Sequence, residues 1–151
     1  MTPKTRNILI IAVTAGFVVM MTTYKRNIKS EATISKTATV TNSNAAVDLT
    51  KIVYEINQKC PTMTDDQTRL DSVTQKDNFL LTYHLTLPKV SNKNYDIAKF
   101  KASMQEKLCN DYVTTTDPSY QSMRKSNIAL AYDYKDKDGG FMAYFICEPN
   151  K

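Results

Sequence analysis

Glycine is scarce in this sequence. Only three of its 151 residues are glycines, tryptophan is absent, and there is a single histidine. Phosphate-binding loops depend on closely spaced glycines, and the chain contains none of the patterns GxxxxGKS/T, GxGxxG or GxSxG. These absences argue against a nucleotide-binding loop and against the nucleophile elbow of α/β-hydrolases, so the sequence does not point directly to a catalytic class.

An excess of charge of one sign is also missing outside the N-terminus. The formal net charge is +5, from 20 basic and 15 acidic residues. Five of the basic residues lie in the first 29 positions, which hold no acidic residue, so the rest of the chain holds 15 of each. A nucleic-acid-binding protein shows a basic stripe or patch. We therefore expect no nucleic-acid partner.

One segment, residues 8–24, is long, largely apolar and free of charge. A helix of 17 residues spans roughly 25 Å, the lower limit for crossing a bilayer. Basic residues flank the run on both sides, and no A-x-A cleavage site follows it. We therefore expect residues 1–29 to be an uncleaved signal anchor that contacts the lipid bilayer through residues 8–24. A cleaved signal peptide and a buried core helix are the alternatives.

The orientation of such an anchor is not fixed by charge, because basic residues lie on both sides of it. A short basic segment before an apolar run is how export signals begin. The sequence then predicts a single-pass protein of the inner (cytoplasmic) membrane with a periplasmic C-terminal domain. Residues 30–46, rich in Thr, Ser, Asn and Ala, are expected to form a flexible polar linker to a globular domain at 47–151.

Hydrophobic spacing within 47–151 predicts three helices and four strands. Apolar residues recur at helical spacing in two segments, Pro118 can open a short third helix, and three of the four expected strands show period-two alternation. The expected helices are 47–60, 96–112 and 118–125, and the expected strands are 68–74, 79–87, 128–134 and 141–147. The predicted fold class is α+β, in the order α-β-β-α-α-β-β. It is a two-layer domain with a four-stranded antiparallel sheet and helices on one face.

Residues 60–72 read CPTMTDDQTRLDS and carry a family resemblance. The segment resembles the motif LPMMVDxxTRLDS, followed by a T-Y-x-Y-x-L strand, of a group of small uncharacterised bacterial proteins. A later Y-x-Y…D-x-D-G hairpin, here Tyr132 to Gly139, is similar to that of the same group. Cys60 replaces a Leu of the motif, and Leu85 replaces its second Tyr. The resemblance covers about residues 50–147 and implies domain limits, but no function.

The motif also supplies the candidate binding residues. Arg69 and Asp71 are two positions apart on an expected strand and therefore share a face. Together with Asp65 and Asp66 they form a candidate polar binding patch. The alternative is an exposed row of ion pairs, or an arginine that ties down a loop. The single histidine, His84, lies on the polar side of its strand, where a solvated or structural role is expected.

No metal site or cofactor is expected from the sequence. One histidine and three widely spaced cysteines match no zinc-ligand spacing. The segment 136–139, DKDG, is better explained as a hairpin turn than as a calcium loop, because the Gly and Glu of an EF-hand are missing. The tyrosines of the expected strands, including Tyr144, are expected to pack as cross-strand pairs rather than form a binding face.

The expected exported domain holds three cysteines, so one disulfide would leave one thiol unpaired. Cys109 flanks the apolar stripe of the expected helix 96–112, and Cys147 shares a strand face with Phe141 and Phe145. If that face packs on the helix, a Cys109–Cys147 disulfide can form and Cys60 remains free. A Cys60–Cys147 bridge, or no bridge, are the alternatives.

These features favour a membrane-anchored, non-enzymatic accessory or binding module of the bacterial envelope that binds a protein partner or another envelope component. One alternative is an enzyme of unrecognised type that uses Asp65, Asp66, Arg69, Asp71 or His84. Another is an inhibitor or immunity protein that acts in the envelope. The sequence alone does not separate the three, and it does not indicate an oligomeric state.

Overall fold

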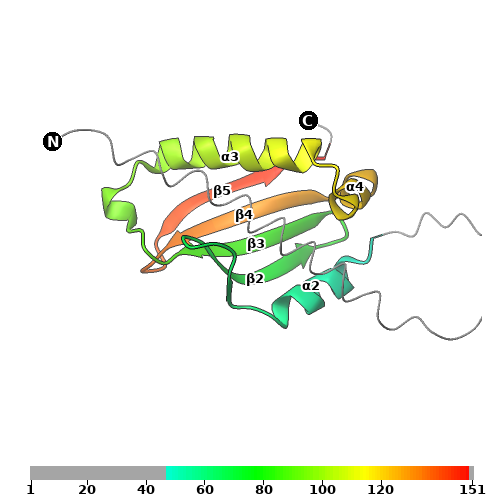
Figure 1. The fold of residues 1–151 in the computed structure, drawn as a ribbon, viewed down its shortest axis with the longest axis horizontal. Helices are drawn as coiled ribbons and strands as arrows, with labels where there is room; N and C mark the ends of the chain where they lie inside the picture. The colour runs from blue at the N-terminus through cyan, green and yellow to red at the C-terminus, as the bar shows by residue number, and fades with distance from the viewer. Residues whose placement is uncertain (1–46, 150–151) are drawn as a thin grey trace, which may run out of the picture.

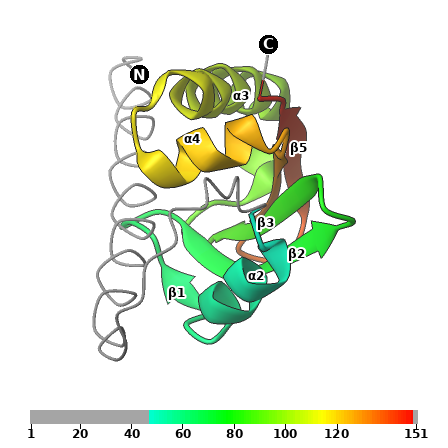
Figure 2. The same cartoon turned by 90° about the vertical axis from the view of Figure 1, so that its right-hand side faces the viewer.

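The computed structural model describes residues 47–149, which form a single sheet with helices packed on one of its faces (Figures 1 and 2). In chain order the elements are α2 (Leu49–Asn57), β1 (Thr62–Met63), β2 (Arg69–Lys76), β3 (Leu80–Leu87), a 3-10 turn (Asn92–Asn94), α3 (Ile97–Thr114), α4 (Pro118–Lys125), β4 (Ala129–Asp136) and β5 (Phe141–Cys147).

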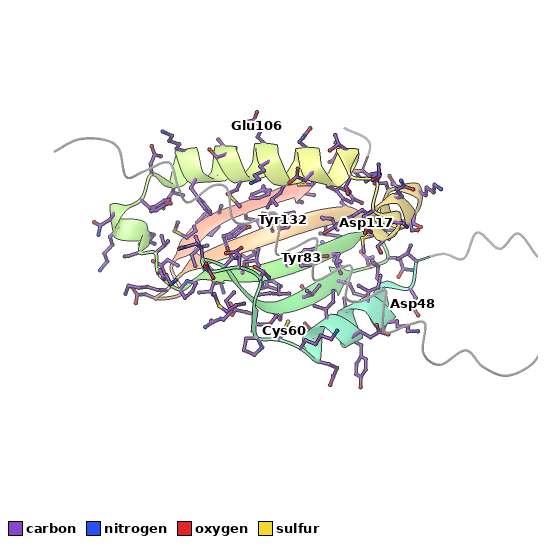
Figure 3. All side chains as sticks on the ribbon, in the orientation of Figure 1. Asp48, Cys60, Tyr83, Glu106, Asp117 and Tyr132 are labelled. Carbon is purple, nitrogen blue, oxygen red and sulfur yellow. A yellow bond between two sulfur atoms is a disulfide. The ribbon has the colours of Figure 1, made fainter. Side chains whose placement is uncertain are left out.

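Each of the three α-helices within residues 47–149 begins at an aspartate. The carboxylates of Asp48, Asp96 and Asp117 accept hydrogen bonds from backbone N–H groups in the first turns of α2, α3 and α4, at 3.1, 3.0 and 2.7 Å. These groups have no partner inside the helix, so a side-chain oxygen at this position stabilises the helix start. Asp48 and Asp117 are visible at the beginnings of α2 and α4 in Figure 3. Pro118 follows Asp117 at the first helical position, where its fixed φ angle suits the helix.

The sheet has five strands in the order β1-β2-β3-β4-β5. All neighbours are antiparallel except β3 and β4, which are parallel. The predicted four-stranded antiparallel sheet is therefore wrong: there is an additional two-residue strand, β1, and the sheet is mixed. The reason is the connection from β3 to β4, which runs through α3 and α4 and returns the chain to the end of the sheet where β3 began.

The predicted membrane anchor, its bilayer segment 8–24 and the linker 30–46 all lie outside the described residues. Within residues 47–149, no helix has both the length and the apolar character needed to cross a membrane. The predicted fold class included such a helix, and the predicted inner-membrane location required one. Neither prediction is retained.

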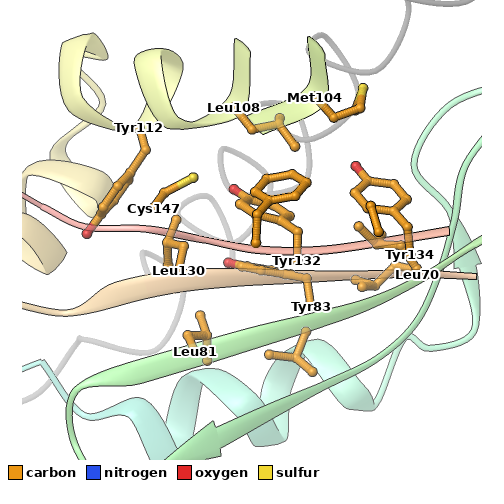
Figure 4. Close-up of a cluster of buried hydrophobic side chains, with 14 of the residues drawn as sticks. Leu70, Leu81, Tyr83, Met104, Leu108, Tyr112, Leu130, Tyr132, Tyr134 and Cys147 are labelled. Carbon is orange, nitrogen blue, oxygen red and sulfur yellow. The ribbon is translucent and has the colours of Figure 1, made fainter. Parts of the chain in front are cut away.

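The core lies between the sheet and the helices (Figure 4). Alternate residues of the strands face the helices, as period-two alternation requires. On the sheet side they include Leu70, Val73, Leu81, Tyr83, Leu85, Leu130, Tyr132, Tyr134, Ala143, Phe145 and Cys147. On the helix side they are Leu49, Ile56, Met104, Leu108, Tyr112, Tyr120 and Met123.

Aromatic rings occupy the middle of this core. The Tyr83 and Tyr132 rings stack with centroids 5.6 Å apart, and the Tyr132 and Phe145 rings with centroids 5.4 Å apart. These contacts join β3, β4 and β5, and they add a directional term to the burial of apolar area. Burial raises the pKa of the Tyr83 and Tyr132 hydroxyls well above the ordinary value, so both rings stay neutral.

Asp136, at the end of β4, organises the β4–β5 hairpin. Its buried carboxylate accepts three backbone hydrogen bonds, from the N–H groups of Asn92 (2.9 Å), Asp138 (3.0 Å) and Gly140 (2.6 Å). The hairpin is thereby attached to the loop that leaves β3. A Cβ atom at Gly140 would lie 2.6 Å from the Asn92 side-chain nitrogen, so no larger residue fits there without displacement.

The Cys109 and Cys147 sulfurs form a disulfide, with their Cα atoms 4.8 Å apart. This bond joins α3 to the end of β5 and closes a loop with a sequence separation of 38. Cys60, which precedes β1, is not bonded to another cysteine and is half-buried. Burial and the nearby Asp71 carboxylate raise the pKa of the Cys60 thiol, which favours its neutral form.

Replacing Asp136 with Asn is expected to lower the melting temperature at neutral pH. The N–H groups of Asn92, Gly140 and Asp138 hold the pKa of the Asp136 carboxyl below its ordinary value. The stability that this provides is present above about pH 4 and is lost as the pH falls through the lowered pKa. The difference between wild type and Asp136→Asn should therefore shrink in thermal melts at about pH 3. Asp138→Asn is the control, because that side chain is exposed and its carboxylate pairs with Lys137.

Replacing both Cys109 and Cys147 with Ser is expected to lower the free energy of unfolding by about 3–4 kcal/mol, because a disulfide around a loop of this length restricts the unfolded chain. Urea denaturation of the double variant and of the wild type measures the difference. Cys60→Ser, which removes the unbonded thiol, should change it far less. Equal effects of the two changes would contradict this assignment.

Candidate binding surface

The sheet face opposite the helices is called the open face here. Strand register arranges its side chains in rows: three cross from β2 to β5, and a fourth, Lys76–Leu80–Ala129, crosses from β2 to β4. Residues paired across neighbouring strands project from the same side of a sheet. The rows, read from β2 to β5, are Thr74–Thr82–Ala131–Ile146, Ser72–His84–Asp133–Tyr144 and Arg69–Thr86–Lys135–Phe141. The described helices all contribute to the core on the other face.

The middle of the open face carries a hydrogen-bonded line across three strands. The Thr74 hydroxyl oxygen lies 2.9 Å from Nε2 of His84, and Nδ1 of His84 lies 3.1 Å from a carboxylate oxygen of Asp133. Thr74 is on β2, His84 on β3 and Asp133 on β4. All three side chains are at least partly exposed, so the line is reachable from solvent. We call it the Thr74–His84–Asp133 line.

A second polar group lies beside this line on β2 and β3. Nε of Arg69 donates to Oδ1 of Asp71 at 2.5 Å, and the Thr86 hydroxyl donates to Oδ2 of the same carboxylate at 2.5 Å. Asp71 sits where the β2–β3 register shifts, which turns its carboxylate toward both partners. Both open-face carboxylates therefore have a basic or imidazole partner within hydrogen-bonding distance.

Beside the polar centre, β5 contributes an apolar strip. Phe141 is 58% exposed, and Tyr144 and Ile146 are each 40% exposed. They are the β5 members of the three rows, so they lie side by side along one edge of the open face. Single exposed apolar residues are common, but an adjoining set is typical of an interaction surface. The prediction that Tyr144 would pack like the other strand tyrosines is therefore wrong.

The residues of the predicted binding patch are divided between two places. Arg69 and Asp71 lie on the open face, and His84 lies in the row next to that of Arg69. Asp65 and Asp66 lie in the loop between β1 and β2, where the Asp65 carboxylate accepts from the Gln67 N–H at 2.7 Å. Asp65 is close enough to Tyr134, a core residue, to contribute to the raised pKa of its hydroxyl.

The partners of His84 could not be found from the sequence alone. Asp133 is 49 residues away and Thr74 is ten residues away. Each becomes a neighbour only through strand register, and the register of the parallel β3–β4 pair is not encoded by a turn. The local signal was limited to polar residues at alternate positions of each strand. That signal places all three on one face without identifying them as partners.

The chemistry open to this surface is hydrogen bonding and proton exchange. When a hydroxyl, an imidazole and a carboxylate are hydrogen-bonded in this order, the carboxylate orients the imidazole. The imidazole can then act as a base and activate the hydroxyl. Among residues 47–149 there is no group of three or more His, Cys, Asp or Glu side chains that could hold a metal ion. His84 and Asp133 by themselves supply two potential metal ligands.

Comparison with known proteins gives one family and a shared fold. A family model described as a domain of unknown function (DUF8479) matches residues 44–143. No curated protein has a significantly similar sequence. The crystal structure of a putative secreted protein from Pseudomonas aeruginosa is 17% identical, with a TM-score of 0.51, and the match covers 65% of this chain and 83% of that one. This similarity shows a common fold.

Two pilotins of type II secretion systems show a weaker structural similarity. The Vibrio vulnificus protein is 6% identical, with a TM-score of 0.48, and the match covers 64% of this chain and 80% of that one. The Vibrio cholerae protein is 11% identical, with a TM-score of 0.45, and the match covers 64% and 81%.

Substitutions in the polar line should barely affect folding. His84→Gln removes hydrogen bonds on an accessible surface, where water can replace them, so we expect a loss of less than about 1 kcal/mol in the free energy of unfolding. Leu81→Asp, on the buried face of the same strand, introduces an unpaired charge into the core and should cost more than about 3 kcal/mol. Urea titration of both variants tests the assignment of the two faces, and the reverse ranking would refute it.

Proposed function

The chain belongs to the DUF8479 family, and we propose that its domain is a non-catalytic binding module of the bacterial envelope that docks a partner protein on the open face. The observation that carries this proposal is the apolar strip of Phe141, Tyr144 and Ile146 beside a polar centre whose carboxylates are already paired. Protein interfaces combine a desolvated apolar and aromatic cluster with polar groups around it.

Two features support a place in the envelope. Disulfides persist mainly in oxidising compartments, and Cys109 and Cys147 are bonded. The uncharged run 8–24, preceded by Lys4 and Arg6, has the composition of an export signal. The partner is therefore expected to be another protein of the envelope. An inhibitor or immunity protein would use the same open face, and its partner would be an enzyme.

The Thr74–His84–Asp133 line favours a second candidate, a hydrolase or acyl-transfer enzyme with Thr74 as nucleophile. In that reaction the Thr74 oxygen attacks an acyl ester, His84 takes the hydroxyl proton and passes it to the departing alcohol, and water later releases the acyl group. The line lies on an accessible sheet face, which favours docking over this chemistry. Hydrolysis of p-nitrophenyl acetate that Thr74→Val abolishes would support the enzyme.

Site-specific crosslinking tests the docking proposal. The photo-crosslinker p-benzoylphenylalanine replaces Tyr144 on the open face in one variant and Tyr54 on α2 in the other. Tyr54 is 65% exposed, so it is a matched control of the same residue type at another surface. We expect a discrete crosslinked species from position 144 in the envelope fraction, and none of the same size from position 54.

The apolar strip should carry that interaction. Ile146→Asp, introduced together with the crosslinker at position 144, is expected to abolish the crosslinked species because the partner would have to bury an unpaired charge. Phe79→Asp, which changes an exposed residue of the β2–β3 turn, should leave it unchanged. Equal crosslinking from positions 54 and 144, or survival of the species in Ile146→Asp, would show that the open face is not the docking site.

A further inference from the structure

We propose that the outer edge of β5 accepts an extended, uncharged segment of the docked partner as a sixth strand of the sheet. This inference rests on the proposed function, because it states how the partner would lie against the apolar strip. When a strand is added to a sheet edge, backbone hydrogen bonds supply affinity and alternate side chains supply specificity. The direction of the β5 backbone, the contrast between the two sheet edges and the composition of β5 all lead to this mode of docking.

The backbone groups of the apolar strip point away from the sheet. The Asp136 N–H donates to the Gly140 carbonyl oxygen at 2.8 Å, so at Asp136 the backbone of β4 is directed toward β5. This direction alternates along a strand, so every second residue of β4 before Asp136 is also hydrogen-bonded to β5. The register partners of those residues on β5 are Ala143, Phe145 and Cys147. The N–H and C=O groups of Tyr144 and Ile146, which alternate with those partners, are therefore directed toward the outer edge.

The opposite edge of the sheet is occupied by the chain itself. The Asn57 side chain of α2 binds both backbone groups of Val73 on β2: its amide nitrogen donates to the Val73 carbonyl oxygen at 2.8 Å, and its amide oxygen accepts from the Val73 N–H at 2.7 Å. β1 pairs with the beginning of the same strand, at Arg69 and Leu70. A partner strand would have to displace these contacts, so β2 is not the edge that it would use.

The β5 edge has no such cover among residues 47–149. No described side chain forms a hydrogen bond with the backbone N–H of Tyr144 or Ile146. The Cys109 sulfur lies 3.8 Å from the Ile146 carbonyl oxygen, but a disulfide sulfur has no hydrogen to donate, so this oxygen can still accept. Unpaired backbone donors and acceptors along a sheet edge form a template for another extended chain.

The composition of β5 permits pairing and defines the segment that pairs. Natural edge strands are blocked by lysine, proline, inward-pointing charges or bulges. β5 reads FMAYFIC and contains no charge and no proline, and its one register shift lies near Phe141, so residues 143–147 are regular. Charge complementarity favours an uncharged segment, because a charged residue opposite Tyr144 or Ile146 would lose hydration without meeting an opposite charge. Apolar residues at alternate positions of that segment would widen the apolar strip.

The backbone N–H of Ile146 distinguishes strand addition from side-chain contact alone. With the crosslinker at position 144, Ile146→Pro removes this N–H, whereas Ile146→Ala shortens the side chain and keeps it. We expect the crosslinked species from Ile146→Pro at about one-tenth of the yield from Ile146→Ala, because a carbonyl oxygen of the partner loses its donor. Equal yields from the two variants would overturn strand addition and leave docking intact.

A folding control accompanies this comparison. Ile146→Pro should still show a cooperative thermal melt, since its N–H takes no part in the pairing with β4 and proline is tolerated at such edge positions. Phe145→Pro, which removes an N–H that faces β4, should abolish the cooperative melt.

Amide hydrogen exchange of the free wild-type protein, followed by NMR, tests the edge without a partner and without a proline variant. In dilute protein, the protection of the Tyr144 and Ile146 amides should be at least about tenfold lower than that of Ala143 and Phe145. Equal protection would overturn the inference, because the edge would already be covered. Protection of Tyr144 and Ile146 that grows with protein concentration would overturn it in favour of a second copy of the chain.

The crosslinked partner separates this inference from the proposed function. Mass spectrometry of the species from position 144 should locate the crosslink in a segment with apolar residues at alternate positions and no charge among them. A crosslink within a highly charged segment would overturn strand addition while leaving docking intact. Absence of any crosslinked species from position 144 in the otherwise wild-type protein would overturn the proposed function, and strand addition with it.

Discussion

The parallel pairing of β3 with β4 is the constraint on which the rest of the domain depends. Parallel neighbours cannot be joined by a tight turn, so the chain between Leu87 and Ala129 must cross from one end of the sheet to the other. It does so as α3 and α4, on the face that carries the aromatic core. With α2 on that face as well, the described elements leave the other face of the four long strands without a helix. The open face, and with it the proposed binding surface, follows from the topology.

This crossover is attached to the sheet at two points and is held together at a third. Where it leaves β3, the Asp136 carboxylate holds the N–H of Asn92. In the middle, the disulfide from Cys109 joins α3 to β5. At the turn between the helices, the Arg124 guanidinium donates to the carbonyls of Tyr112 and Thr115, groups that the end of α3 leaves unpaired. Packing, hydrogen bonds and a covalent bond therefore act together on one long connection.

Local patterns in the sequence located the elements better than they arranged them. The expected strand 79–87 and β3 nearly coincide, because apolar alternation reflects burial on one side of a strand. The direction of the neighbouring strand could not be predicted in the same way. Alternation is the same for parallel and antiparallel neighbours, so β4 was assigned the wrong direction relative to β3. The functional surface shows the same limit. His84 was placed on the polar side of its strand, yet its contact with Asp133 depends on the register between two strands separated by the crossover.

The hydrogen-bonded pairs at the polar centre of the open face limit what a partner can gain there. Arg69 with Asp71, and His84 with Asp133, already form hydrogen bonds with each other, and covering such pairs removes hydration without adding new attraction. Affinity must then come mainly from the apolar strip on β5, where Tyr144 and Ile146 lose water at little electrostatic cost. The polar line contributes selectivity, because a partner atom placed at Thr74 must match the direction of its hydroxyl bond. In the docking proposal, such a surface binds through one edge and discriminates through its centre.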